Sequence, residues 1–174
     1  MGAKAGRKGM AAEQAVPVVT NQFDFSNIVT GCVLRFESVA FENHIELESE
    51  IENDILFEGN EKQIKQLIVI FLDNACKFGK DGKVKVYFYK KADKIYLSVN
   101  NTGEVINDAD MEHIFEHFYR ADKSRARKAG GYGLGLSIAS AIVKNHKGKI
   151  QVESTSKTGT TFTAVFPTKI RKIE

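Results

Sequence analysis

Four glycines stand within six residues in the stretch KAGGYGLGLSIASAIVKNH, which runs from Lys128 to His146. Backbone without Cβ atoms can approach a ligand closely, and the start of a helix offers unpaired N–H groups and the positive end of a dipole. This arrangement predicts a loop that binds phosphate, and a loose glycine hinge is the alternative. It is not a Walker loop, because no Lys-Ser or Lys-Thr pair follows the glycines.

Two further stretches hold polar residues where a predicted helix or strand ends. In DNACKF, Asn74 and Lys77 share one helix face, so an amide oxygen able to ligate Mg²⁺ lies beside an ammonium able to meet phosphate. In VNNTGEVI, Asn101 can both accept and donate hydrogen bonds, which suits the edge of an adenine. The alternatives are a polar helix end that faces water and an ordinary strand-ending turn.

A cationic segment separates these stretches from the glycines. In IFEHFYRADKSRARK, Phe115 and Phe118 are predicted to anchor a short helix, and a basic run follows them. The run predicts a lid that carries cations to a triphosphate, and a solvated loop or weak contact with nucleic acid is the alternative. The net charge of the chain is only +3, too small to argue for nucleic acid.

Hydrophobic periodicity predicts the elements that position these residues. A period of 3.6 residues predicts helices and a period of two predicts strands. The order of these elements predicts an α+β fold, a two-layer α/β sandwich with helices packed on one face of a mixed sheet. The predicted helices cover 23–43, 60–79 and about 134–146, with a short helical piece within 108–120, and the predicted strands cover 44–51, 83–90, 94–100, 148–154 and 160–167.

The helix over 60–79 has the clearest sequence signals. Asn60 can cap its start, Gln63 follows three residues later as in a variant of the capping box, and Gly79 ends it. Its predicted buried stripe consists of Ile64, Leu67, Ile68, Phe71, Ala75 and Phe78.

The chain is predicted to form one domain over 23–170, with a flexible lead-in at 1–22 and a tail at 171–174. Its longest apolar run, LIVIFL, is too short to span a bilayer, and the basic start lacks the apolar region of a signal peptide. Cys32 and Cys76 each lie among apolar residues at helical spacing, so buried reduced thiols are predicted rather than a disulfide or metal pair. These features favour an intracellular location.

In this order and spacing, the stretches resemble the ATP-binding catalytic domain of bacterial sensor histidine kinases, within the wider family that includes gyrase, Hsp90 and MutL. LIVIFLDNACKF resembles its asparagine box, NNTGEVI its first glycine box, and IFEHFYRADKSR its phenylalanine box. GGYGLGLSIASAIVKNHKGKIQVES resembles the second glycine box with the helix and strand after it, and GTTF the final threonine-bearing element. The resemblance covers about 23–167, and FYRADKSR and GGYGLGLSIA are typical of sensor kinases in particular.

The resemblance implies a site for ATP and Mg²⁺ beneath a long ATP lid. Asn74 would ligate Mg²⁺ and Lys77 would meet phosphate, and these two with Arg120, which would reach the γ-phosphate, are the implied catalytic residues. Asn101 would read the adenine amine, and Thr160 would lie under the adenine. The other implied contacts are Phe78, Gly103 and Ile106 beside the base, and Gly131, Gly133, Leu134, Gly135 and Leu136 around the phosphates.

Three positions distinguish this chain within the family pattern. The first glycine box usually reads Asp-x-Gly-x-Gly, but Asn101 and Val105 replace its carboxylate and its second glycine. An amide oxygen still accepts from the adenine amine, without charge assistance, at a cost of about 1 kcal/mol. Ile70 stands one helical turn before Asn74, where hydrolytic relatives carry a general-base glutamate. An apolar residue there cannot activate water or serine, which favours phosphoryl transfer to a neutral imidazole.

The expected function is that of the ATP-binding catalytic domain of a two-component sensor histidine kinase, which transfers the γ-phosphoryl of ATP to a histidine on a separate dimerisation domain. None of His44, His113, His117 and His146 lies in a predicted helical hairpin, so the acceptor histidine is expected outside this chain. The implied partners are that domain and, through the full-length protein, a response regulator. The parent is expected to be membrane-anchored with this part in the cytoplasm, and this part alone to be a monomer. The alternative is a non-catalytic nucleotide-responsive or structural module of the same fold.

Overall fold

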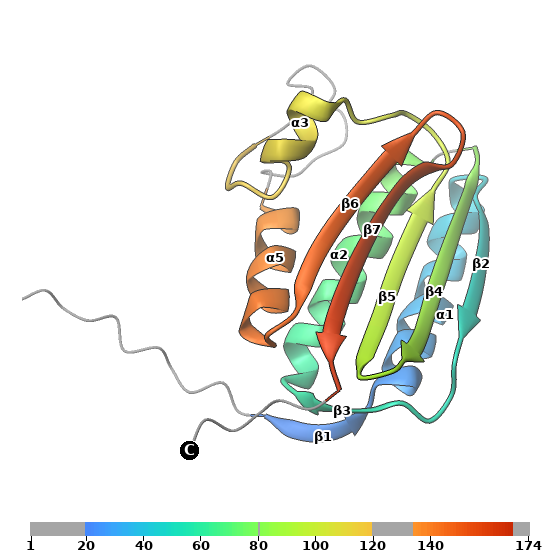
Figure 1. Cartoon of the computed structure of the whole chain (residues 1–174). Coiled ribbons are helices and arrows are strands. Elements are labelled where there is room, and N and C mark those ends of the chain that lie inside the picture. The colour runs from blue at the N-terminus through green and yellow to red at the C-terminus, as the bar shows by residue number, and fades with distance from the viewer. Residues whose placement is uncertain (1–19, 80, 120–133, 169–174) are drawn as a thin grey trace, which may run out of the picture.

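A computed structural model of the chain describes residues 20–79, 81–119 and 134–168 (Figure 1). The predicted lead-in before residue 20, the basic run that begins at Arg120, and the predicted tail lie outside these residues. Within the described residues, no helix combines the length and the apolar character needed to cross a bilayer.

Five strands form one mixed sheet, and the longer helices cover one of its faces (Figure 1). Edge strand β2 pairs in parallel with β4, and the other neighbouring strands pair antiparallel. The predicted fold, with helices packed on one face of a mixed sheet, is confirmed. In sheet order the strands are β2 (Glu46–Ile51), β4 (Lys83–Lys91), β5 (Lys94–Asn101), β7 (Gly159–Pro167) and β6 (Lys149–Thr155). The helices are α1 (Phe25–Glu42), α2 (Glu61–Phe78), α5 (Gly135–Asn145) and the short α3 (Asp108–His113).

A second, two-stranded sheet was not predicted. It consists of β1 (Asn21–Asp24) and β3 (Leu56–Gly59), which pair antiparallel. The prediction of a helix from residue 23 was therefore wrong at its start, because Phe23 lies in β1 and α1 begins at Phe25, where the Asp24 side chain caps it. The sequences of these strands, NQFD and LFEG, do not alternate apolar and polar residues, so they carry no strand signal.

Alternate residues of the central strands face the helices and form the core, as a period of two requires. Ring contacts join the layers, for example between Phe71 on α2 and Phe162 on β7, whose centroids are 5.9 Å apart. Cys32 and Cys76 are buried and unpaired, as predicted. Phe78 does not belong to the buried stripe, because it lies in the last turn of α2 and its side chain is 58% exposed. The buried apolar residues of the central strands β4, β5 and β7 are Val84, Val86, Phe88, Ile95, Leu97, Val99, Phe162, Ala164 and Phe166.

The start of α2 shows how one local prediction was half right. The Asn60 side chain accepts a hydrogen bond from the Gln63 N–H at 3.0 Å, so Asn60 is the predicted N-cap. Gln63 does not complete a capping box, since the Asn60 N–H donates instead to His146 Nε2 at 3.0 Å. His146 is 1% exposed, and its Nδ1 bonds the Ile142 carbonyl at 2.8 Å. Burial lowers the pKa of His146, which is consistent with a neutral imidazole.

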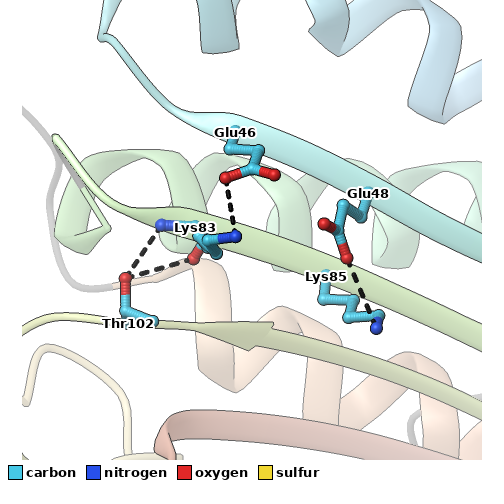
Figure 2. A network of polar contacts seen from close by, with 5 residues as sticks. All are labelled: Glu46, Glu48, Lys83, Lys85 and Thr102. Atoms are coloured by element: carbon cyan, nitrogen blue, oxygen red, sulfur yellow. Dashed lines mark hydrogen bonds and ion pairs between the residues drawn. The ribbon is translucent and has the colours of Figure 1, made fainter.

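The opposite face of the sheet carries ion pairs between β2 and β4 (Figure 2). Lys83 Nζ lies 2.7 Å from a Glu46 carboxylate oxygen, and Lys85 Nζ lies 3.3 Å from Glu48 and 3.2 Å from Glu50. The hydrogen bond from Lys83 lowers the pKa of Glu46. Exposed pairs of this kind contribute little stability, but charges on an edge strand oppose pairing with another sheet.

Candidate functional site

The helix-facing side of the sheet becomes polar at its last row. Asn101 on β5 lies opposite Thr160 on β7, and Thr160 lies opposite Ser154 on β6. Asn101 and Thr160 are each only 3% exposed. The preceding row on the same face is apolar and consists of Val99, Phe162 and Val152. Buried polar side chains need hydrogen-bond partners, so this row is the candidate floor of a binding site.

The Asn101 side-chain amide makes one hydrogen bond with the described residues. Its Nδ2 donates to the Thr102 carbonyl at 3.1 Å, and among the described residues no group donates to its Oδ1. Thr102 is held in turn, because its hydroxyl accepts from the Lys83 N–H at 2.8 Å (Figure 2). Asn101 therefore presents a hydrogen-bond acceptor rather than a donor to a ligand.

Glycines allow the backbone to close around Asn101. Gly103 and Gly159 have φ angles of 133° and 77°, in the region that favours glycine. A Cβ at Gly103 would collide with the Phe78 carbonyl oxygen, and one at Gly159 with the Asn101 carbonyl oxygen. These close approaches bring the end of α2, the end of β5 and the β6–β7 turn together.

The first turn of α5 lies beside the middle of α2. Leu134 is the N-cap of α5 and makes no side-chain capping bond. A Cβ at Gly135 would lie 3.5 Å from Ile70 Cγ2, an ordinary packing distance, so the protein itself does not require glycine there. Ile70 stands one helical turn before Asn74, which is half-buried. His146 at the end of α5 contacts Asn60 before the start of α2, so the two helices run antiparallel, and the first-turn amides of α5, which have no cap among the described side chains, lie at the end where α2 finishes.

The last turn of α2 carries a charge and an aromatic ring. Lys77 Nζ forms an ion pair with Asp73 at 2.8 Å. Phe78 is 58% exposed, and its backbone carbonyl lies against Gly103. A Cβ at Gly79, the C-cap, would lie 3.1 Å from the Asn101 Cβ, so the helix end packs directly on Asn101.

The chain after Gly103 is hydrogen-bonded to the polar row formed by Asn101, Thr160 and Ser154. The Ile106 N–H donates to Ser154 Oγ at 2.9 Å, and Ser154 Oγ lies 2.7 Å from Thr160 Oγ1. Thr160 Oγ1 lies 3.4 Å from the Glu104 carbonyl oxygen. The predicted residues Ile106 and Thr160 therefore meet through Ser154, which the sequence analysis did not single out.

Of the two aromatic residues predicted to anchor the next segment, only one does so. Phe115 packs edge-on against Phe162, with centroids 6.2 Å apart. Phe118 is 71% exposed and has a positive φ of 62°, so the prediction that it anchors a helix was wrong. The reason is that α3 ends at His113, so Phe118 lies five residues beyond the end of the helix.

The structure therefore gathers most of the predicted site residues at one end of the sheet. Asn101, Gly103, Ile106, Phe78 and Thr160 meet through the contacts above. Asn74 and Lys77 lie on the last two turns of α2, and Leu134, Gly135 and Leu136 form the start of α5. The remaining predicted residues, Arg120, Gly131 and Gly133, lie outside the described residues.

The donors and acceptors present fit an adenine nucleotide. Asn101 Oδ1, which has no donor among the described residues, matches the exocyclic amine of adenine, and the exposed Phe78 side chain offers an apolar surface to a flat base. The uncapped start of α5, with space at Gly135, suits phosphate. Among the described residues no cluster of three or more His, Cys, Asp or Glu side chains could hold a metal by itself. A Mg²⁺ ion that bound the phosphates would need only one or two protein oxygens, such as Asn74 Oδ1.

The chain matches one family model over residues 59–170, described as the histidine kinase-, DNA gyrase B- and HSP90-like ATPase. It is 48% identical over 109 residues to the signal transduction histidine-protein kinase ArlS of Staphylococcus epidermidis, covering 62% of this chain and 24% of that protein. It is 34% identical over 144 residues to the sensor histidine kinase RppB of a Synechocystis strain, covering 82% of this chain and 32% of that protein. The chain thus spans about a quarter to a third of the length of these relatives.

Solved structures resemble the chain over most of its length. The catalytic domain of the histidine kinase ThkA superposes with a TM-score of 0.74 at 27% identity, covering 86% of this chain and 96% of that domain. A structure of ThkA in complex with the response regulator TrrA superposes with a TM-score of 0.72 at 26% identity, covering 86% of this chain and 42% of that one. These matches agree with the family resemblance of the sequence motifs.

Proposed function

Because this chain belongs to the histidine kinase-, DNA gyrase B- and HSP90-like ATPase family, we propose that it is the ATP-binding catalytic domain of a sensor histidine kinase. The single observation that carries the proposal is the amide of Asn101. It lies in a buried polar row, its Nδ2 is hydrogen-bonded to the Thr102 carbonyl, its Oδ1 has no donor among the described residues, and the end of α2, which carries the exposed Phe78, packs on it. This combination selects a base with an exocyclic amine.

The described residues have distinct proposed roles. Asn101 accepts from the adenine amine, Thr160 lies under the base, and Gly103 and Ile106 form its other side with Phe78. The start of α5, at Leu134, Gly135 and Leu136, binds phosphates, joined by Lys77. Asn74 is the proposed ligand of Mg²⁺, which when bound neutralises the charge of the phosphates. Arg120, Gly131 and Gly133 are assigned to the phosphates only by family resemblance.

The proposed reaction transfers the γ-phosphoryl group of ATP to an imidazole nitrogen, so a P–O bond to ADP breaks and a P–N bond forms. Ile70 supports this reaction over hydrolysis. Its partly buried side chain packs against the core beside Gly135 and places no carboxylate one turn before Asn74. A neutral imidazole needs no general base to remove a proton before it attacks.

The partners and location proposed for this chain follow from its relatives. The acceptor histidine belongs to a dimerisation domain of the same parent kinase, and the full-length protein passes the phosphoryl group to a response regulator. We place this domain in the cytoplasm, within a membrane-anchored parent. The isolated domain is proposed to be a monomer, which light scattering would test.

Calorimetric titration with a non-hydrolysable ATP analogue, with and without Mg²⁺, tests the nucleotide site. Binding at micromolar to sub-millimolar strength is expected, and Asn74→Ala should remove its dependence on Mg²⁺. Asn101→Ala should weaken binding about tenfold, because a buried hydrogen bond to the base is lost. Asn100→Ala is the matched control, since its amide bonds Thr158 and Thr161 on the opposite face of β5.

Transfer needs a separate assay, in which the chain is mixed with its dimerisation domain and Mg-ATP. Phosphohistidine should form on that domain, and the isolated chain should release no phosphate steadily. If the folded chain shows no binding at millimolar nucleotide, the proposal fails in favour of a non-catalytic module. The replacement of the usual carboxylate by Asn101, and the exposed Val105 in place of a glycine, are the features that favour that second function.

A further inference from the structure

Three hydrogen bonds form a chain that begins and ends on the same loop. The Ile106 N–H donates to Ser154 Oγ at 2.9 Å, Ser154 Oγ lies 2.7 Å from Thr160 Oγ1, and Thr160 Oγ1 donates to the Glu104 carbonyl at 3.4 Å. The hydroxyls of β6 and β7 thus hold the loop 104–106 at two backbone groups.

The contacts of this chain differ in length. Those of Ser154 with the Ile106 N–H and with Thr160 Oγ1, at 2.9 and 2.7 Å, are ordinary hydrogen bonds, and either hydroxyl can donate between Ser154 and Thr160. The contact between Thr160 Oγ1 and the Glu104 carbonyl, at 3.4 Å, is long for a hydroxyl donor. Thr160 can therefore exchange that contact for one with a ligand, while Ser154 keeps hold of both Thr160 and Ile106.

We propose that Ser154 is a positioning residue of the nucleotide site, which holds the loop 104–106 beside the base and orients the hydroxyl of Thr160. Its role in binding rests on the proposed function, whereas its hold on the loop does not. Ser154 acts on the base only through Ile106 and Thr160.

The position of Ser154 in β6 supports a role beyond packing. The inward-facing positions before it, Ile150 and Val152, are apolar and pack against the core. An apolar residue at 154 would continue that pattern, so the core itself does not require a hydroxyl there. The hydroxyl instead meets the loop that follows Asn101.

The strands also contain a similar pair that touches no loop. Ser98 Oγ lies 2.9 Å from Thr163 Oγ1 across β5 and β7. Both residues alternate with the buried positions and face the uncovered side of the sheet. Ser98→Ala therefore removes a cross-strand hydroxyl of the same kind away from the site and serves as the matched control.

The first measurement is residue-resolved amide exchange by NMR on the nucleotide-free chain. Ser154→Ala should speed exchange of the Ile106 amide about tenfold or more, while the amides of β5 and β7 keep their protection. Ser98→Ala should leave Ile106 unchanged. Ser154→Thr, which restores a hydroxyl on a residue that strands favour, should restore the slow exchange.

The second measurement is calorimetric affinity for the ATP analogue. Ser154→Ala should weaken it about three- to tenfold, the loss of about one hydrogen bond, with recovery in Ser154→Thr and no change in Ser98→Ala. Unchanged exchange at Ile106 in Ser154→Ala, or no recovery in Ser154→Thr, would overturn the proposal. If wild-type chain bound no nucleotide, the proposed function would fail, and the exchange data would still decide whether Ser154 holds the loop.

Discussion

His146 offers the sharpest test of how the helices are held together. Its imidazole is 1% exposed and packs against the rings of both Phe57 and Phe166, with centroids 5.9 and 6.2 Å away. Its Nε2 accepts the N–H of Asn60, so the end of α5 provides the backbone cap for the start of α2. His146→Phe keeps an aromatic ring of similar size in this place and leaves the Asn60 N–H without an acceptor.

The expected loss of stability is the cost of leaving the Asn60 N–H without a hydrogen-bond acceptor in the folded protein. An unsatisfied buried donor costs about 1–3 kcal/mol. With an m value of about 2 kcal/mol per M, the midpoint of urea unfolding at pH 7.5 should fall by about 0.5–1.5 M. His117→Phe is the matched control, because His117 is exposed and should change the midpoint by less than about 0.25 M.

The effect should also depend on pH in a known direction. Burial holds the pKa of folded His146 below its ordinary value of 6.5, so the unfolded chain binds the proton first as pH falls. The stability contributed by neutral His146 is fully present above pH 6.5 and declines below it. The advantage of wild type over His146→Phe should therefore shrink between pH 7.5 and 5.5.

The titration of His113 does not affect the comparison between wild type and His146→Phe. Its hydrogen bond with Glu116 raises its pKa, so its contribution has the opposite sign, and it is present in both proteins. Equal urea midpoints for wild type and His146→Phe at pH 7.5, or a difference that stays constant down to pH 5.5, would refute the assigned role of His146.

Three further outcomes are expected. Gly159→Ala should lower the free energy of unfolding by about 2 kcal/mol or more in urea titrations, because its φ is positive and a Cβ would strike the Asn101 carbonyl; wild-type stability would contradict this. Burial raises the pKa of Cys76 to about 11, so its thiol should react with iodoacetamide at pH 8 about a hundredfold more slowly in the folded than in the unfolded chain. Comparable rates would refute its burial. Thr102→Val removes the hydroxyl that accepts from the Lys83 N–H and should weaken ATP-analogue binding, measured by calorimetry, about threefold without unfolding the chain. Unchanged affinity would show that this hydroxyl does not help to position Asn101.

Features decided by neighbouring residues could be predicted from the sequence. The N-cap at Asn60 and the stop at Gly79 depend only on the chemistry of a helix end, and both were confirmed. The hairpin between β6 and β7 and the start of α5 were also found within a residue or two. The family motifs located Asn101 and Thr160, which the structure brings into one buried row.

Contacts between distant segments were decided only by the tertiary structure. Asn60 and His146 are 86 residues apart, and nothing local indicates that a histidine replaces Gln63 as partner of the cap. Ser154 and Ile106 meet across 48 residues, and the alternation of β6 marks Ser154 only as the next inward-facing position after Ile150 and Val152. Periodicity says which side of an element is buried, but not which other element lies against it. The hydrogen-bond partners that complete this site therefore follow from the packing of the sheet and helices, whereas the residue types that could serve it were already visible in the sequence.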